Sequence, residues 1–244
     1  MKTLNTTKNI KIIGAVAAVS IFALLPLIFQ GSSYFSLIAS LVCIYTIAVS
    51  GLDISFGYTG QISLGHAGFY AIGAYTSAIL RNNIGMPVLF CMIIGACLSG
   101  LVGAILAIPT SKLVFHFLSL ATIAFGEIIY LLITRSPAGI TGDYAGLFTE
   151  PVSFFGINLD THTKFYYFGL VCVIIFLLAK NSIYNSRVGR AFVAIKENVH
   201  AANGMGVNVR KYKVIAFTLS ALYNGFAGAM YVHLINYISP ETFM

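Results

Sequence analysis

Long apolar segments dominate this sequence and limit the folds that it can adopt. Seven of them cover residues 12–30, 34–52, 62–80, 86–110, 113–133, 165–179 and 214–238. An α-helix needs roughly 20 apolar residues to cross a hydrocarbon layer about 30 Å thick, and most of these segments approach or exceed that length. The sequence therefore predicts an all-α fold. We expect a polytopic transmembrane helical bundle with about seven spans, forming a single domain over residues 1–244.

The amino-acid composition argues against a soluble protein. Hydrophobic residues make up 58% of the chain and charged residues only 9%. A soluble domain of this size uses roughly 25% charged residues, because it must cover its core with a hydrated surface. The charges available here are too few for that purpose, which favours a lipid-facing exterior.

The net charge of +7 raises the alternative of a nucleic-acid-binding protein, but the positions of the charges favour a membrane topology. Three lysines precede the first apolar segment, and seven basic residues lie within residues 180–213. Clustered basic residues between spans are typical of cytoplasmic loops. We therefore expect a cytoplasmic N-terminus, a cytoplasmic loop at about 180–213, an extracytoplasmic loop at about 134–163, and no nucleic-acid partner.

No pattern in the sequence indicates an enzyme site. A nucleotide-binding P-loop requires Gly-Lys followed by Ser or Thr, and the chain contains no Gly-Lys pair. The histidines, acidic residues and cysteines show neither metal-ligand spacing nor a nucleophile with a base. We expect no catalytic residues, no cofactor and no metal.

A glycine-rich polar stretch at residues 57–66 interrupts the apolar sequence and predicts a broken or re-entrant helix near 53–66. Such breaks often form substrate sites in transporters, because freed backbone groups can bind a polar ligand. The alternative is a tight cytoplasmic turn, which the carboxylate of Asp53 favours. The candidates for the translocation path in this stretch are Gly57, Tyr58, Thr59, Gly60, Gln61 and His66.

Glu127 lies well inside the apolar segment 113–133. A carboxylate at that depth costs on the order of 2.5–3.5 kcal/mol on insertion scales, so we expect it to face the bundle interior. Two roles are open for it. It either tethers neighbouring helices or belongs to the translocation path.

The loop after Ser186 predicts a short helix over residues 189–202, which Gly204 and Gly206 would end. A short helix with basic flanks can rest on an anionic membrane surface or dock into a cytoplasmic partner. Both interpretations remain open from the residues alone.

Several motifs in this region resemble a known family. The spacing Ala201-Ala202-x-x-x-Gly206 is similar to the loop that permeases of ATP-binding-cassette (ABC) importers insert into their ATPase subunits. Together with the stretches at 57–69, 120–129 and 186–197, it resembles the branched-chain amino acid ABC permease family, M-type subunit. The resemblance implies an ATPase-coupling role for Glu197, His200, Ala201, Ala202 and Gly206. His200 departs from the pattern, which has glutamate at this position, and Asp53 stands where Asn is expected.

The resemblance also implies that the chain is a multi-pass protein of the inner membrane and that it has a set of partners. These are a homologous partner permease, two ABC ATPase subunits, an extracytoplasmic substrate-binding protein and membrane lipid. The implied substrates are branched-chain amino acids, with urea or short amides as the alternative. A secondary transporter that uses Glu127 and a non-transport membrane scaffold are the rival classes. The resemblance stops abruptly at Met244, where relatives continue into further apolar spans, so we expect this chain to be truncated at its C-terminus.

Overall fold

The computed structural model describes Phe22 and residues 33–113, 115–136, 139–149, 153–154, 157–158 and 161–243. Its long helices are α2 (Ser33–Leu52), α3 (His66–Ile84), α4 (Val88–Thr110), α5 (Phe115–Thr134), α6 (His162–Asn185) and α9 (Val209–Ile235). Its shorter helices are η1 (Asp53–Gly57), η3 (Asp143–Ala145), α7 (Arg187–Glu197), α8 (Val199–Gly204) and η4 (Pro240–Phe243). The fold is an all-α bundle, as expected. Apart from Phe22, the segment expected at 12–30 lies outside the described residues.

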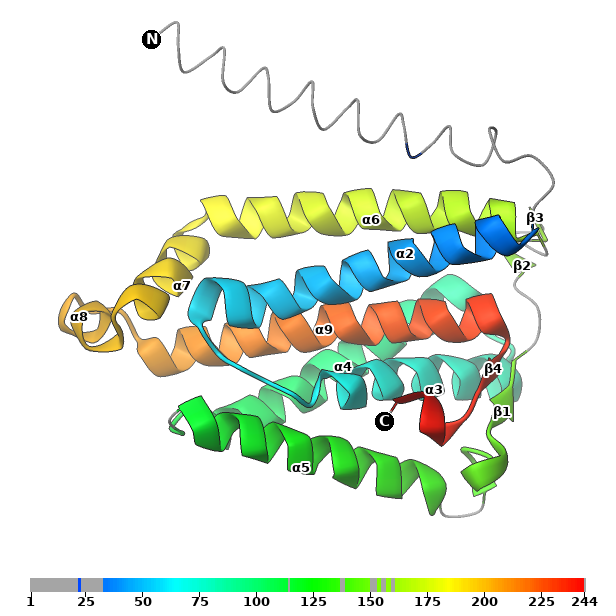
Figure 1. The fold of residues 1–244 in the computed structure, drawn as a ribbon, viewed down its shortest axis with the longest axis horizontal. Coiled ribbons are helices and arrows are strands. Elements are labelled where there is room, and N and C mark those ends of the chain that lie inside the picture. The colour runs from blue at the N-terminus through cyan, green and yellow to red at the C-terminus, as the bar shows by residue number, and fades with distance from the viewer. Residues whose placement is uncertain are drawn as a thin grey trace, which may run out of the picture.

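The long helices lie side by side in a bundle, with α9 at its centre (Figure 1). Helix α9 packs against α2, α3 and α4, whereas α6 packs mainly on α2 and α5 mainly on α3. The short helices α7 and α8 lie at one end, which we call the α7–α8 end (Figure 1). The short strands lie at the opposite end.

Five helical segments of the described chain are long and apolar enough to cross a membrane. They are Ser33–Gly57, Val88–Thr110, Phe117–Thr134, His162–Asn185 and Val209–Ile235. The expected segment 62–80 instead becomes α3, which carries Arg81, Asn82 and Asn83 in its last turn. Helix α3 contacts α4, α5 and α9, so it needs a less apolar surface than a lipid-facing helix does. The expected total of seven spans is therefore not confirmed.

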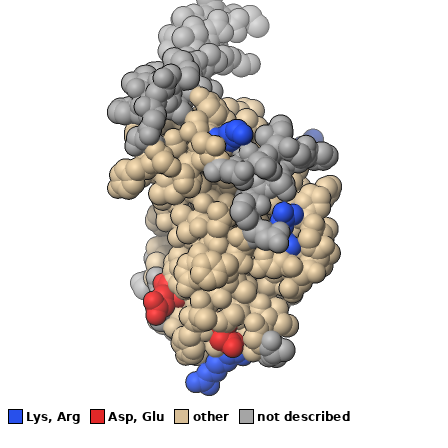
Figure 2. Space-filling model, turned by 90° about the vertical axis from the view of Figure 1, so that its right-hand side faces the viewer, with Lys and Arg blue, Asp and Glu red and all other residues tan. Residues whose placement is uncertain are grey.

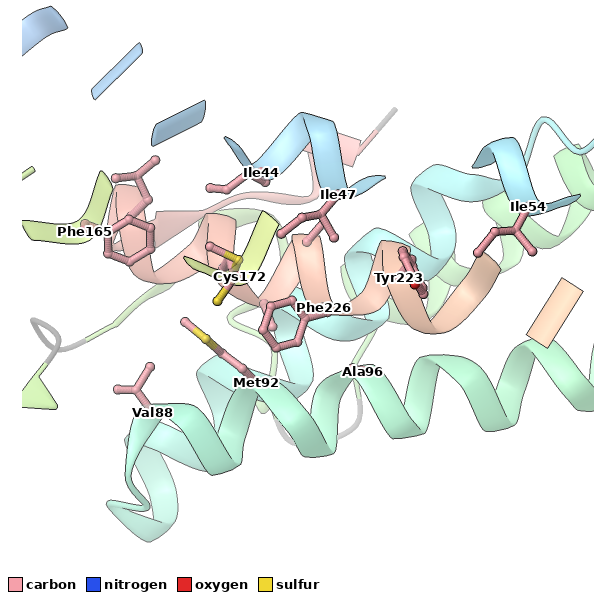
Figure 3. Close-up of a cluster of buried hydrophobic side chains, with 14 of the residues drawn as sticks. Ile44, Ile47, Ile54, Val88, Met92, Ala96, Phe165, Cys172, Tyr223 and Phe226 are labelled. Atoms are coloured by element: carbon pink, nitrogen blue, oxygen red, sulfur yellow. The ribbon is translucent and has the colours of Figure 1, made fainter. Parts of the chain in front are cut away.

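The largest cluster of buried apolar side chains comes mainly from α2, α4, α6 and α9. Figure 3 shows Ile44 and Ile47 of α2 facing Phe226 of α9, with Met92 of α4 and Cys172 of α6 completing the group. All five side chains are buried. Burial of this surface joins helices that are far apart in the sequence.

Small residues allow the central helices to approach one another closely. A methyl group at Gly225 of α9 would overlap Ser99 of α4, and one at Gly103 of α4 would overlap Ala221 of α9. A methyl group at Gly73 of α3 would overlap the backbone of Gly225. Small residues recur at every fourth position in both helices, as Gly95, Ser99 and Gly103 in α4 and as Ala221, Gly225 and Ala229 in α9. This spacing predicts a close approach of neighbouring helices, which the structure confirms.

The opposite end of the bundle carries the short strands. Strand β1 (Leu147–Phe148) pairs antiparallel with β4 (Tyr237–Ile238), and β2 (Ser153–Phe154) pairs with β3 (Ile157–Asn158). Figure 2 shows this end face-on, as a mostly uncharged surface with a few basic and acidic side chains. The β1–β4 pair joins the loop after α5 to the chain after α9.

Candidate functional site

The expected break in the helices is present between α2 and α3. Helix α2 runs into the π-helical turn η1, helical structure ends at Thr59, and residues 60–65 are not helical before α3 begins at His66. Gly60 has a φ of +70°, in the left-handed region that favours glycine. This segment crosses the bundle from the end of α2 to the start of α3 (Figure 1).

Hydrogen bonds hold the break against two other helices. The Gln61 side chain donates to the carbonyl of Lys213 in α9 at 3.1 Å. The Thr122 hydroxyl of α5 accepts from the backbone N–H of Leu64 at 3.1 Å, and the Ser119 hydroxyl donates to the carbonyl of Ile62 at 3.2 Å. Groups from α5 and α9 thus satisfy part of the hydrogen-bonding capacity of this non-helical segment.

His66 connects the start of α3 to α9 and to η1. Its Nε2 lies 2.7 Å from the Ser220 hydroxyl, which in turn lies 3.3 Å from the Ser55 hydroxyl. Its Nδ1 lies 3.2 Å from the Ser63 carbonyl oxygen. Because Ser220 is near the middle of α9, the break reaches from the α7–α8 end to about half the depth of the bundle.

The path candidates in the break differ in their surroundings. The side chains of Thr59, Gln61 and His66 are buried, and each has hydrogen-bond partners within the chain. Gly57 makes room for a neighbour, because a methyl group there would overlap the Asp53 carboxylate. These contacts give the residues a structural role in holding the break in place.

A charged and aromatic cluster beside the break was missed at the sequence level. The Lys180 ammonium of α6 lies 2.6 Å from the Asp53 carboxylate and 5.6 Å from the centre of the Tyr58 ring. The Tyr58 ring also packs on Tyr184, with centroids 5.1 Å apart. Asp53 and Tyr58 offered a weak signal, but nothing in the sequence pairs them with residues about 130 positions away.

The expectation that Glu127 faces the bundle interior is wrong for this chain. Glu127 is exposed, as are Leu120, Ile123 and Leu131, which share its face of α5. Helix α5 packs mainly on α3, so its far side is left uncovered. The sequence places a carboxylate in an apolar segment but does not say on which side the neighbouring helices lie.

The expected helix over 189–202 is divided into α7 and α8. Asn198 adopts an extended conformation between them, and its side chain accepts hydrogen bonds from the backbone N–H groups of His200 and Ala201. Asn is a preferred N-cap residue, so this signal was available in the sequence. The division turns α8 away from the direction of α7.

The residues expected to couple to an ATPase fall into two groups. Glu197, His200 and Ala201 are exposed, and Met205 beside them is 86% exposed. Ala202 is only 5% exposed, so of the two alanines only Ala201 lies on the surface. Gly206 is exposed and has a φ of +82°, in the left-handed region that favours glycine.

Helix α7 lies next to the break. A methyl group at Gly60 would come 3.7 Å from the Lys196 side chain of α7. The segment at 57–66 and the helices of the 180–213 loop, expected from separate motifs, therefore meet at the same end of the bundle.

One family matches almost all of the described chain. The model of the family described as branched-chain amino acid transport system / permease component matches residues 34–244. The chain belongs to this family. Its members supply a permease component to a transport system, which agrees with the helical bundle and its five apolar spans.

Several curated permeases are similar in sequence. The high-affinity branched-chain amino acid transport system permease protein LivM of Escherichia coli (strain K12) is 32% identical, over 84% of this chain and 54% of that protein. A probable LivM of Methanocaldococcus jannaschii is 27% identical, over 81% of this chain and 59% of that protein. The ribose import permease protein RbsC of Escherichia coli (strain K12) is 27% identical, over 80% of this chain and 56% of that protein.

This permease chain spans about half the length of the curated relatives that it matches. No solved structure matches it significantly.

Proposed function

We propose that this chain is the membrane-spanning subunit of an ABC importer and forms part of the path for branched-chain amino acids. The observation that carries the proposal is the 32% identity to the Escherichia coli LivM permease over 84% of this chain. The proposed partners are a homologous permease, two ABC ATPases and an extracytoplasmic binding protein. ATP is hydrolysed in the ATPase subunits.

The α7–α8 end is the proposed contact with the ATPases. An importer must carry the closure of its ATPases to the membrane gate, which requires a stiff connection. Helix α8 offers exposed residues to a partner, while α7 packs against α9 and touches the break at Gly60. Glu197, His200, Ala201, Met205 and Gly206 form the proposed docking surface.

The exposed face of α5 around Glu127 is the proposed wall of the translocation path. A carboxylate facing hydrocarbon is costly, so this face belongs against water or protein rather than lipid. A water-filled path between this chain and its partner permease satisfies the carboxylate. The break at 57–66 lies beside α5 through the Leu64–Thr122 and Ile62–Ser119 hydrogen bonds, so movement of α7 can reach the path through it.

Transport by the reconstituted complex tests the proposal. The full-length protein is co-expressed with its genetically linked ATPases and partner permease, placed in liposomes, and supplied with the binding protein and radiolabelled leucine. We expect uptake that requires ATP and is inhibited by isoleucine and valine but not by ribose, urea or acetamide. Uptake driven by a proton gradient without ATP would contradict the proposal, and inhibition by ribose or urea alone would contradict the substrate.

A further inference from the structure

A groove in two parts lies at the α7–α8 end, where the end of α4, helix α8 with the turn after it, and the start of α9 meet. Its polar part has a volume of about 490 Å³, and its lining includes Ser111, Lys112, His200, Asn203, Asn208 and Arg210. Its apolar part has a volume of about 340 Å³ and is lined by Ile108, Asn208, Arg210, Lys211, Val214 and Ile215. Asn208 and Arg210 line both parts, so the two adjoin there.

The groove has a strong excess of positive charge. Lys112, Arg210 and Lys211 line it, and none of the acidic residues that the structure describes does. Within the described part of the chain, no carboxylate forms an ion pair with any of these three residues. The groove therefore presents three cations whose charges the described residues do not neutralise.

Arg210 stands where the polar and apolar parts meet. Its guanidinium donates a hydrogen bond to the carbonyl oxygen of Ile108 at 3.5 Å. A guanidinium has five N–H donors, and this bond uses one of them. The bond holds the cation beside the apolar part while leaving it able to bind an anion in the polar part.

The position of the groove matches the boundary between hydrocarbon and water. Helices α4 and α9 are both apolar enough to span a membrane, and the basic residues lie at or beyond their ends. Basic pockets between spans on the cytoplasmic side attract the headgroups of anionic lipids. A phospholipid carries a charged phosphate next to apolar acyl chains, just as the polar part of the groove lies next to the apolar part.

We propose that this groove binds an anionic phospholipid of the cytoplasmic leaflet. The phosphate lies between Lys112 and Arg210, with Lys211 beside it, and one acyl chain lies along Ile108, Val214 and Ile215. The bound lipid bridges the end of α4 and the start of α9, next to α8. The proposal rests on the membrane orientation given above and not on the identity of the transported substrate.

Tryptophan fluorescence can test the site, because the chain contains no tryptophan. Ile108→Trp places a single reporter at an exposed position in the apolar part, and Leu178→Trp places one at an exposed position on α6. The purified proteins are placed in phosphatidylcholine bilayers with a minor fraction of brominated phosphatidylglycerol or brominated phosphatidylcholine. We expect phosphatidylglycerol to quench Ile108→Trp more strongly than phosphatidylcholine does, and the two lipids to quench Leu178→Trp equally.

Removing the cations should remove this preference. In the Ile108→Trp background, Lys112→Gln, Arg210→Gln and Lys211→Gln should each lower the apparent affinity for phosphatidylglycerol by about fivefold, the effect of one basic residue near a membrane surface. Arg187→Gln removes an exposed cation of α7 outside the groove and should have no effect. Equal quenching of Ile108→Trp by both lipids would overturn the proposal.

Competition and uptake measurements distinguish the lipid site from a site for a soluble anion and from the transport function. Displacement of the brominated lipid by excess inorganic phosphate would show a site for a soluble anion and would also overturn the proposal. Normal leucine uptake in a protein without lipid selectivity would overturn the lipid site while leaving the proposed transport function intact.

Discussion

The carboxylate of Asp53 and the ammonium of Lys180 lie 2.6 Å apart and join the π-helical end of the first described span to α6. Gly57 makes this geometry possible, because any larger residue there would overlap the carboxylate. The pair lies at the α7–α8 end, one turn before the chain passes from α6 into α7. The ion pair therefore links η1, where the break begins, to the helix that leads into α7.

Loss of either partner should destabilise the protein modestly. The Asp53 side chain is 42% exposed and that of Lys180 is 17% exposed, so water screens the pair. We expect a coupling free energy of about 1 kcal/mol or less between Asp53→Asn and Lys180→Gln. A double-mutant cycle on heat stability in detergent measures it, with Arg187→Gln as the control. Strictly additive effects would show that the pair contributes nothing.

Gly65→Ala should disrupt the contact between the break and α5. The added methyl group would overlap the backbone carbonyl of Thr122, which cannot move without shifting α5. Overpacking of this kind costs roughly 1–3 kcal/mol. Gly204→Ala is the matched control, because a methyl group there meets nothing within 4 Å. Heat stability in detergent compares the two, and an unchanged Gly65→Ala protein would contradict the tight packing.

Ala201→Trp and Met205→Glu should uncouple the permease from its ATPases without unfolding it. Both side chains are exposed at α8, so the changes alter a surface. We expect association with the ATPases to weaken by about tenfold or more, as changes at the centre of an interface do. Co-purification and substrate-stimulated ATP hydrolysis measure the effect.

Two controls accompany the α8 variants. Ser182→Trp adds the same bulk to an exposed position of α6 and should leave coupling unchanged. Ala202→Trp should instead lower stability, because Ala202 is buried. If the Ala201→Trp and Met205→Glu proteins both coupled to the ATPases as the wild type does, α8 would not be part of the ATPase contact.

Glu127 should be accessible to water in the assembled transporter. In a variant with its four cysteines replaced, Glu127→Cys should react with a charged thiol reagent, whereas Ile105→Cys, on an exposed apolar part of α4, should not. Glu127→Gln should reduce uptake severalfold without lowering heat stability. A Glu127→Cys protein as unreactive as Ile105→Cys would place this face of α5 outside the path.

The loop around residue 144 should face the extracytoplasmic side. Tyr144 is exposed in η3, just before β1, which lies at the strand end of the bundle (Figure 1). Met205 is exposed beside α8 at the other end. We expect an impermeant maleimide to label Tyr144→Cys in intact cells and Met205→Cys only after lysis. The reverse labelling pattern would invert the proposed topology.

The membrane bundle was predictable because long apolar segments allow few other folds. The break at 57–66 was predictable for a similar reason, since glycines and polar residues cannot continue an apolar span. The small residues Ser99 and Gly225 likewise predicted close packing between helices, although the sequence does not say which glycine meets which neighbour. These features depend on local sequence, and local sequence is what a single chain reveals.

The features that the sequence did not predict depend on long-range arrangement. Lys180 meets Asp53 across 127 positions, and no local pattern links them. The orientation of Glu127 follows from where α3 packs on α5, and the burial of Ala202 follows from the turn at Asn198. The Asn198 cap alone could have been found locally, as a preferred N-cap residue within a stretch expected to be one helix.

Gly225 meets Gly73 and Ser99, and Gly103 meets Ala221, so almost no side chain lies between the central helices. Flexible side chains absorb small displacements by changing rotamer, but backbones in direct contact have no such freedom. Helices α3, α4 and α9 must therefore tilt together or not at all. Helix α9 contains 27 residues and rises about 1.5 Å per residue. A small tilt of α9 that begins beside α8 therefore displaces the far end of this helix, near the other membrane surface, by a larger distance.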